Sequence, residues 1–206
     1  MITPTIHTKI ALRKFFLNQR KNLSQATATE WSAQICDQLL DYIPASGQTL
    51  HIFLPIAHLN EVNIWPFLKY LWAQHPAVKT CASVADFDNT TMPSYYVQAS
   101  TDWQTNRWGI PEPKPFTHQL CPAERISMVL VPLVAFDKRG HRVGYGKGFY
   151  DRFLATCQPN VIKIGLSFFD PVEVITDIQP NDIGLDYCIC PNKVWSFEQE
   201  TNKSLG

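Results

Sequence analysis

The feature that most limits the folds open to this chain is an apolar segment followed by a glycine-rich one. Residues 128–134 (MVLVPLV) show no alternation of polar and apolar positions, which predicts a buried strand. Residues 140–151 (GHRVGYGKGFYD) follow shortly after it. The glycine-rich segment is therefore expected to lie at the end of a buried strand.

The glycine-rich segment has the features of an anion-binding loop. Its glycines allow positive φ angles and let successive backbone N–H groups face one ligand. Arg142 and Lys147 add positive side chains, and residues 149–154 (FYDRFL) predict a helix whose N-terminal dipole faces the same place. Phosphate is the ligand that suits this arrangement. Asp151, in the first helical turn, either balances the helix dipole or binds magnesium beside the phosphates, and its position leaves both open.

Two common nucleotide-binding motifs are absent from this segment. The P-loop pattern GxxxxGK[ST] fails because Gly148 follows Lys147, and the dinucleotide pattern GxGxxG fails because Phe149 stands where the third glycine is needed. A glycine-rich hairpin without a ligand is the alternative interpretation. The two cations and Asp151 favour the binding loop.

Composition bounds the class of protein. A chain of 206 residues suits one domain with a substantial core. Its 18 basic and 18 acidic residues cancel, which excludes the broad basic surface used in nonspecific nucleic-acid binding. Six cysteines without a CxxC pattern predict buried free thiols. Without a signal-peptide pattern or an apolar run near ~18 residues, we expect a cytoplasmic monomer with no membrane or nucleic-acid partner.

The N-terminal part of the chain predicts two helices. The first covers residues 5–20, where Lys9 and Arg13 share one face, and a solvated face is the simpler interpretation of that pair. The second is expected to begin at Ser24 or Thr27 and to end before Pro44.

A β-α-β unit is predicted next, from strands at 49–54 and 78–84 with a helix at 64–74 between them. Such a unit implies parallel pairing of its strands. Glu61 follows the first strand, where ligands bind in open α/β sheets. An acid that caps the following helix, or lies in its first turn, is an equally good interpretation of Glu61.

Later segments predict further strands at residues 94–98, 161–168 and 187–190. Residues 107–115 (RWGIPEPKP) predict a stiff loop, in which Trp108 either stacks on a planar ligand or fills the core. Residues 176–186 predict an acidic, turn-rich loop, and residues 198–206 predict a frayed tail.

Several segments together resemble the family of 5-formyltetrahydrofolate cyclo-ligases, also called methenyltetrahydrofolate synthetases. They are KIALR at 9–13, IFLPIAHLNEV at 52–62, WGIPEP at 108–113, VPLVAFDKRGHRVGYGKGFYDRFL at 131–154, KIGLSF at 163–168 and NDIGLD at 181–186. The resemblance implies one domain, residues 1–197, built as a three-layer α/β/α sandwich around a mostly parallel sheet, with N-terminal helices at 5–42 packing on it. It also implies that ATP and magnesium are used to close 5-formyltetrahydrofolate to 5,10-methenyltetrahydrofolate, with release of ADP and phosphate.

The resemblance further implies roles for single residues. It places ATP at Lys9, Arg13, Arg142, Val143, Gly144, Tyr145, Gly146, Lys147, Gly148, Phe149 and Tyr150. It places folate at Leu54, Glu61, Trp108, Tyr145, Gly146, Lys147, Gly148 and Phe149, and magnesium at Asp151 and Asp182. Arg142 and Lys147 are the expected catalytic residues, because phosphoryl transfer to the formyl oxygen, before attack by N10, needs positive charge around the transferring group. The chain departs from the family pattern at Leu133, Val143 and Pro171, and Leu133 is expected to narrow or reshape the pocket.

Two other functions stay open at this point. A nucleotide-dependent oxidoreductase would need a strand-GxGxxG-helix unit, which is missing. A non-catalytic folate- or nucleotide-binding protein of the same fold would not be expected to keep Lys147, Asp151 and Asp182 together.

Overall fold

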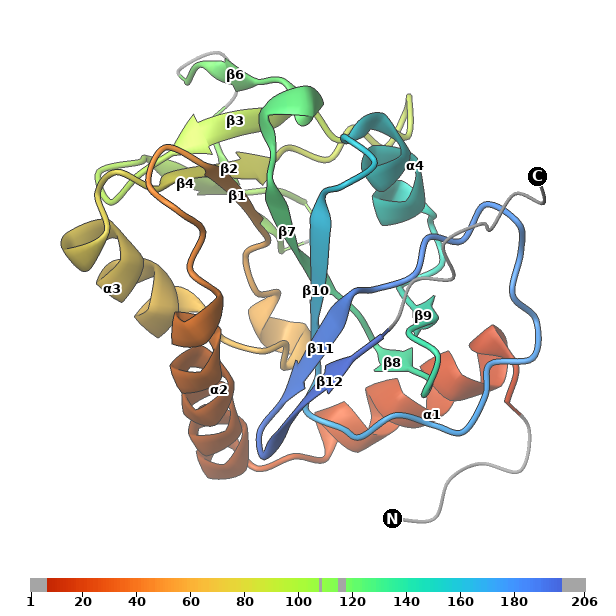
Figure 1. Ribbon diagram of the computed structural model, residues 1–206. Coiled ribbons are helices and arrows are strands. Elements are labelled where there is room, and N and C mark those ends of the chain that lie inside the picture. The colour runs from red at the N-terminus through yellow and green to blue at the C-terminus, as the bar shows by residue number, and fades with distance from the viewer. Residues whose placement is uncertain (1–6, 108, 115–117, 198–206) are drawn as a thin grey trace, which may run out of the picture.

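An eight-stranded sheet forms the centre of the structure, a computed structural model that describes residues 7–107, 109–114 and 118–197. The strand order is β12-β11-β10-β7-β1-β2-β3-β6 (Figure 1). Strands β11, β10, β7, β1 and β2 run parallel, and β12, β3 and β6 are joined to the two edges by antiparallel pairing with their neighbours. Their bounds are β1 Thr49–Ile52, β2 Lys79–Ser83, β3 Ser94–Val97, β6 Leu120–Cys121, β7 Met128–Pro132, β10 Ile162–Leu166, β11 Tyr187–Cys190 and β12 Lys193–Ser196.

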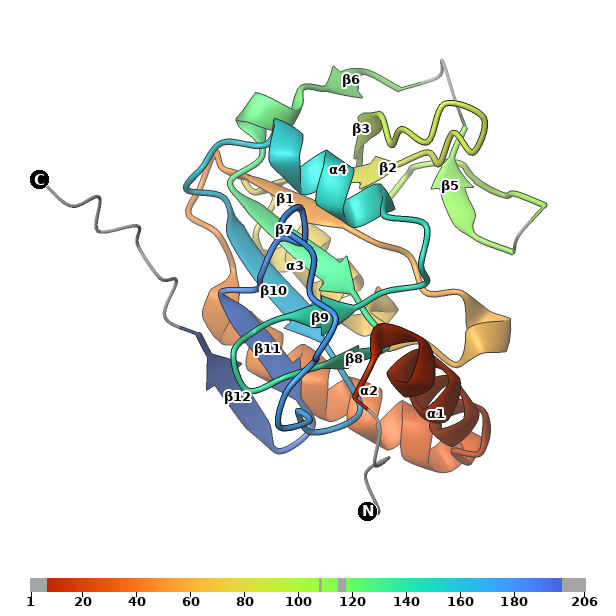
Figure 2. The same ribbon diagram turned by 90° about the vertical axis from the view of Figure 1, so that its right-hand side faces the viewer.

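Helices cover both faces of this sheet. Figures 1 and 2 show α2 (Gln25–Leu39) and α3 (Trp65–Gln74) on one face and α4 (Phe149–Thr156) on the other. Helix α1 (Lys9–Lys21) contacts two short strands, β8 (Ala135–Phe136) and β9 (Arg142–Val143), which pair with each other. Short 3-10 turns are at Leu40–Tyr42, Ala57–Leu59 and Ala123–Arg125. The expected three-layer α/β/α sandwich is therefore confirmed.

Strand β7 explains why the apolar segment shows no alternation. Its residues face opposite layers in turn: Leu130 packs in the core cluster on the α2 and α3 side, whereas Val129 and Val131 pack in the cluster that contains residues of α4. All three are fully buried. A strand with helices on both faces needs apolar residues at every position, so the prediction of a buried strand holds.

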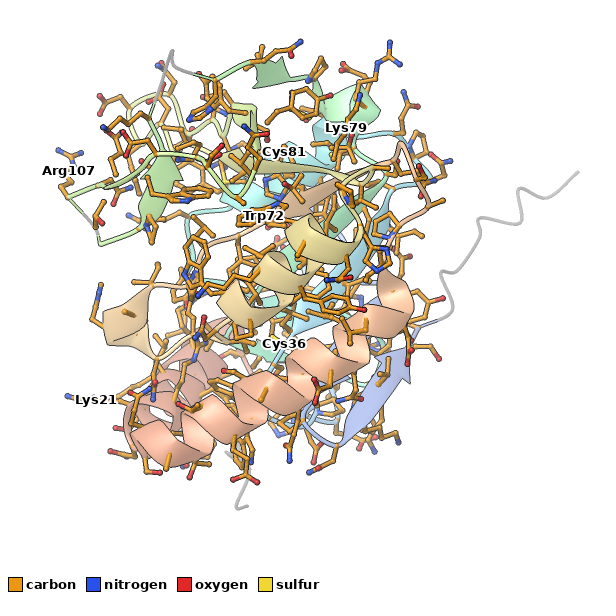
Figure 3. The ribbon with its side chains drawn as sticks, turned by 90° about the vertical axis from the view of Figure 1, so that its left-hand side faces the viewer. Lys21, Cys36, Trp72, Lys79, Cys81 and Arg107 are labelled. Carbon is orange, nitrogen blue, oxygen red and sulfur yellow. The ribbon has the colours of Figure 1, made fainter. Side chains whose placement is uncertain are left out.

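The β-α-β unit is also as predicted, since β1 and β2 pair in parallel and α3 connects them. Trp72 of α3 points toward the sheet in Figure 3, and its indole N–H donates to Thr80 Oγ1 at 2.9 Å. Pro66 lies in the first turn of α3, where no backbone donor is needed. Glu61 does not cap this helix. The N-cap residue is Ile64, and the side chain of Ile64 makes no capping hydrogen bond.

Several predicted boundaries need correction. Helix α1 begins at Lys9 with Thr8 as its N-cap, not at residue 5, because the Thr8 hydroxyl accepts a bond from the backbone of Ala11. Ser24, not Thr27, caps α2, since Ser24 Oγ accepts from the N–H of Thr27 at 3.0 Å.

The segment predicted as a stiff loop at 107–115 contains a short strand. Within it β5 (Pro111–Pro113) pairs antiparallel with β4 (Trp103–Thr105), so the two strands form an arm beside β2. Arg107 lies at the outer end of this arm in Figure 3. The predicted tail at 198–206 falls outside the described residues.

All six cysteines are free thiols, as predicted, and all are buried except Cys157, which is partly exposed. Cys36 lies between α2 and α3 in Figure 3, and burial raises the pKa of its thiol to about 11. In the described part of the chain, no helix has the length and apolar character needed to cross a bilayer.

Candidate active site

A cavity of about 580 Å³ opens where parallel strands β1, β2 and β7 end. Residues at or just past their carboxyl ends line it, including Leu54, Ser83 and Pro132. In open α/β sheets this edge is the one that binds ligands. The lining includes most of the predicted site: Lys9, Arg13, Leu54, Glu61, Arg142, Gly144, Tyr145, Gly146, Lys147, Gly148, Phe149, Tyr150, Asp151 and Asp182.

The glycine-rich segment at residues 140–151, the glycine loop, reaches the cavity because two of its glycines have backbone conformations that other residues rarely adopt. Gly148 has a φ of 66° and is the N-cap of α4, so the start of that helix faces the cavity. Gly146 has a φ of 90°, and a Cβ atom there would lie 3.2 Å from the guanidinium carbon of Arg13. The glycine therefore lets the loop pass closely under the side chain of Arg13.

Lys9 and Arg13 are held by other parts of the chain and do not lie on a solvated face. Arg13 Nε donates to the carbonyl of Gly144 at 2.7 Å. Lys9 Nζ pairs with Asp182, and only 17% of its side chain is exposed. The shared helical face of the pair thus supplies two cations to the cavity.

Arg142 is buried and tied to its surroundings. Its Nη2 donates to Asp151 Oδ1 at 2.6 Å, and its Nη1 contacts the carbonyl oxygen of Ile183. The backbone N–H of Ile183 also donates to Asp151 Oδ1, at 3.1 Å. Burial lowers the pKa of Arg142, and the charge of Asp151 opposes that shift. The arginine therefore joins β9, α4 and the turn-rich loop before β11.

Lys147 differs from the other cations of the cavity. Its side chain is exposed, and Nζ makes no hydrogen bond or ion pair with any residue that the structure describes. No protein carboxylate in that part of the chain neutralises its charge. Lys147 is thus free to meet an anionic ligand.

The two predicted magnesium ligands each keep one carboxylate oxygen uncommitted. Asp151 Oδ1 and Asp182 Oδ2 accept bonds from the protein, whereas Asp151 Oδ2 and Asp182 Oδ1 accept none from the described residues. No group of three or more His, Cys, Asp or Glu that could hold a metal occurs within residues 7–107, 109–114 and 118–197. Magnesium is commonly held by one or two carboxylates with phosphates completing its shell, so the pair fits that mode of binding.

Glu61, which is buried, and Tyr145 form a polar contact in the cavity. The Tyr145 hydroxyl donates to Glu61 Oε1, and the backbone N–H of Ile56 donates to Oε2 at 2.7 Å. Arg20, which no motif indicated, donates to the Tyr145 hydroxyl at 2.9 Å. Burial raises the pKa of Glu61, and these hydrogen bonds together with the charge of Arg20 oppose the shift.

Val143, which was predicted to bind ATP, does not line the cavity, and neither do two departures from the family pattern, Leu133 and Pro171. Val143 is fully buried and pairs with Ala135 between β9 and β8, so it does not line the cavity. Leu133 packs in the core cluster that includes α4 and lines only a small adjoining cavity of about 10 Å³, so it does not narrow the main one. Pro171 is not among the residues lining the cavity. Trp108 lies outside the described residues.

The apolar wall of the cavity was not predicted from the sequence. It comes from the loop after β1, the segment after β2 and the arm, and includes Phe53, Ile56, Phe87, Met92, Ile110 and Pro111. The arm also brings in Glu112, whose Oε1 accepts from Ala85 N and from Asn106 Nδ2, each at 2.9 Å. The IPEP sequence at residues 110–113 contains this acid, but no pattern in it indicates a role for Glu112.

Glu112→Gln is expected to stabilise the protein at pH 7.5 by about 2–4 °C in Tm, the shift that about 1 kcal/mol produces in a chain of this length. Glu112 is 3% exposed and burial raises the pKa of its carboxyl, so its stabilising contribution is present at acid pH and is lost as pH rises through the folded-state pKa. Glutamine keeps an oxygen for both donors without the charge. Thermal unfolding from pH 4 to 8 measures this, and a stability difference that does not shrink on acidification would contradict it.

Comparison with known proteins shows which family the sequence of this chain matches. Residues 5–182 match the family model described as the 5-formyltetrahydrofolate cyclo-ligase family. A 5-formyltetrahydrofolate cyclo-ligase of Mycoplasma genitalium is 42% identical over 188 residues, which cover 88% of this chain and 97% of that protein. The enzyme of the same name from Escherichia coli K12 is 28% identical over 182 residues, 87% of this chain and 98% of that protein.

Two solved structures are similar as well. The NMR structure of Aquifex aeolicus 5,10-methenyltetrahydrofolate synthetase has a TM-score of 0.76 and 25% sequence identity, and the match covers 96% of each chain. A 5,10-methenyltetrahydrofolate synthetase from Mycoplasma pneumoniae has a TM-score of 0.67 and 26% identity, over 88% of this chain and 97% of that one.

Proposed function

The chain belongs to the 5-formyltetrahydrofolate cyclo-ligase family, and from this premise we propose that its cavity closes 5-formyltetrahydrofolate to 5,10-methenyltetrahydrofolate at the expense of ATP. The observation that carries the proposal is the meeting of cations from two distant segments. Lys9 and Arg13 come from α1, and Arg142 and Lys147 come from the glycine loop. Such charge, gathered at the N-terminus of α4, suits the phosphates of ATP.

The chemistry explains why a phosphoryl donor is needed. The formamide oxygen of the substrate is a poor leaving group, so N10 cannot displace it directly. Transfer of the γ-phosphoryl to this oxygen releases ADP and makes it part of a phosphate ester. N10 then attacks the activated carbon and loses its proton, and the oxygen leaves as phosphate while the second C–N bond is completed.

The chain's own residues would act by position and charge. Lys147 is the cation left to contact the transferring phosphoryl group, while Lys9 and Arg13 would hold the phosphates that stay with ADP. Glu61 and the apolar wall would face the folate, whose flat ring suits an apolar surface with few polar partners. We also propose Trp108 for this folate site, on the resemblance alone.

Magnesium would be held by Asp151 Oδ2 and Asp182 Oδ1, directly or through water, and would neutralise phosphate charge when bound. Both acids lie beside cations of the cavity, because Arg142 contacts Asp151 and Lys9 contacts Asp182. A metal held there would therefore lie close to the side chains proposed to bind the phosphates.

One assay tests the proposed function. Purified protein is mixed with 5-formyltetrahydrofolate, ATP and magnesium, and both ADP and the absorbance of the methenyl product are followed. Equal amounts of the two products are expected. Binding of both substrates with no product would favour a non-catalytic folate- or nucleotide-binding protein instead.

Asp151→Asn and Asp182→Asn are each expected to raise the magnesium concentration needed for half-maximal activity, by about tenfold or more. An amide oxygen is a weaker ligand for magnesium than a carboxylate oxygen. Asp177→Asn is the matched control, because Asp177 accepts from the backbone N–H of Lys9 at 2.7 Å and does not line the cavity. Wild-type magnesium dependence in both variants would leave the two acids with structural roles only.

A further inference from the structure

Arg20 is a buried cation that the proposed chemistry does not use. It lies in the last turn of α1, is 5% exposed and is absent from the lining of the main cavity. Its neighbour Lys21 is exposed and points away from the molecule in Figure 3. Burying a guanidinium destabilises the fold unless hydrogen-bond partners offset its lost hydration. The partners of Arg20 therefore indicate what it does.

Two of the partners of Arg20, Tyr145 and Glu61, line the main cavity. Nη2 donates to the carbonyl of Leu133 at 2.9 Å, and Nη1 donates to the Tyr145 hydroxyl at 2.9 Å. Nη1 also lies 3.9 Å from Glu61 Oε1. The backbone carbonyl of Arg20 accepts from Asn60 Nδ2 at 3.0 Å, so the arginine is held to the residue directly before Glu61 as well.

This geometry fixes the direction of the Tyr145 hydroxyl. A phenol has one proton to donate and can accept a second bond. Because Arg20 has no acceptor, the hydroxyl accepts from it and must give its own proton to Glu61 Oε1. The three side chains therefore form a directed chain, in which the arginine reaches the ligand-facing carboxylate through the tyrosine.

The same contacts govern the charge on Glu61. Burial favours its neutral form, and the groups that oppose this are the Tyr145 hydroxyl, the Ile56 N–H, Arg20 and His58. Tyr150, from α4, is a further titratable group close enough to interact with the Glu61 charge. Among all of these, only arginine keeps a positive charge at every pH at which proteins are normally studied.

We propose that Arg20 is a positioning residue for the folate site: it keeps Glu61 ionised and aimed, so that the carboxylate can accept hydrogen bonds from N–H groups of the substrate ring. This inference rests on the proposed function, since it assigns the ligand of Glu61 to the folate. Arg20 itself touches no substrate. Its removal is therefore expected to weaken folate binding through Glu61 and to leave the phosphate-binding side chains in place.

The test is equilibrium binding of 5-formyltetrahydrofolate without ATP, followed by tryptophan fluorescence between pH 6 and 9. Arg20→Met is expected to raise Kd about tenfold at pH 6.5, as expected for loss of a hydrogen-bonded charge, with a smaller penalty at pH 9 because alkali restores the ionised Glu61. Lys21→Met, the same change at the next residue, should leave Kd unchanged. Each variant is compared with wild type at the same pH.

Arg20→Lys keeps the charge without the two-pronged geometry and is expected to recover part of the affinity, and Tyr145→Phe removes the bridge while leaving the bond of Arg20 to Leu133. If Arg20→Met does not fold, these two variants carry the test: both should show a Kd penalty larger at pH 6.5 than at pH 9. A penalty that is independent of pH, or an equal loss of ATP affinity, would overturn the proposal in favour of a plain structural tie. Folate binding without turnover in the wild type would instead contradict the proposed function.

Discussion

Lys147→Ala is expected to lower kcat for cyclisation by about 100-fold or more, with a much smaller change in the KM for ATP. Lys147 lines the cavity on the loop before α4, and within the described residues no carboxylate or carbonyl engages its Nζ. A cation without a protein partner can strengthen its contact as charge develops on the transferring phosphoryl group. Loss of such a contact appears in turnover more than in ground-state binding.

Lys9→Ala is the matched comparison, because Lys9 contributes a cation to the same cavity but already pairs with Asp182. Its removal is expected mainly to raise the KM for ATP. Steady-state kinetics of both variants, each checked for wild-type unfolding behaviour, separate the two roles. Wild-type turnover in Lys147→Ala would contradict a catalytic role for Lys147. The glycine loop would then be a structural hairpin or would only bind the nucleotide.

The sequence predicted those parts of the fold that depend on local pattern. The apolar segment became β7, the segment after the glycines became α4, and the β-α-β unit became β1, α3 and β2. Each of these carries its own signal in a few adjacent residues. Short edge strands such as β6 and β12 were missed, because two to four residues with a mixed pattern of burial give no usable periodicity.

The site was predicted unevenly for a similar reason. The glycine loop could be identified because its glycines, cations and acid are contiguous in the sequence. Arg20, Glu61 and Tyr145 come from three distant segments, and the bond between Arg20 and Tyr145 spans 125 positions. The packing of α1 against β8, β9 and the turn at Ala57–Leu59 brings them together, so no spacing rule could have selected Arg20 from the other charges of its helix.

Val143 shows the limit of transferring roles by position. It lies between two cavity residues, Arg142 and Gly144, yet its side chain is fully buried because neighbouring residues on β9 point to opposite sides. Membership of a contiguous motif therefore does not ensure contact with the ligand. Orientation along the strand decides it.

Arg142→Met is expected to destabilise the fold by about 3–5 kcal/mol, the usual cost of removing one partner from a buried ion pair. In a chain of this length that corresponds to a fall of roughly 6–20 °C in Tm. The change would leave Asp151, in the first turn of α4, without its cation, and the Ile183 carbonyl would lose its charged donor. Thermal unfolding of Arg142→Met, with Lys147→Ala as a control that should unfold like wild type, measures the effect.

A double variant shows how much of this cost belongs to the pair. Adding Asp151→Leu to Arg142→Met removes the carboxylate left unpaired, so the double variant should be more stable than Arg142→Met alone. If the loss of stability in the double variant equals the sum of the losses in the two single variants, Arg142 and Asp151 act independently. If coupling is found, Arg142 serves the reaction largely by holding Asp151 and the loop at Ile183 in place, because its Nη1 and Nη2 atoms are already bonded there. The direct contact with the transferring phosphoryl group is then made mainly by Lys147.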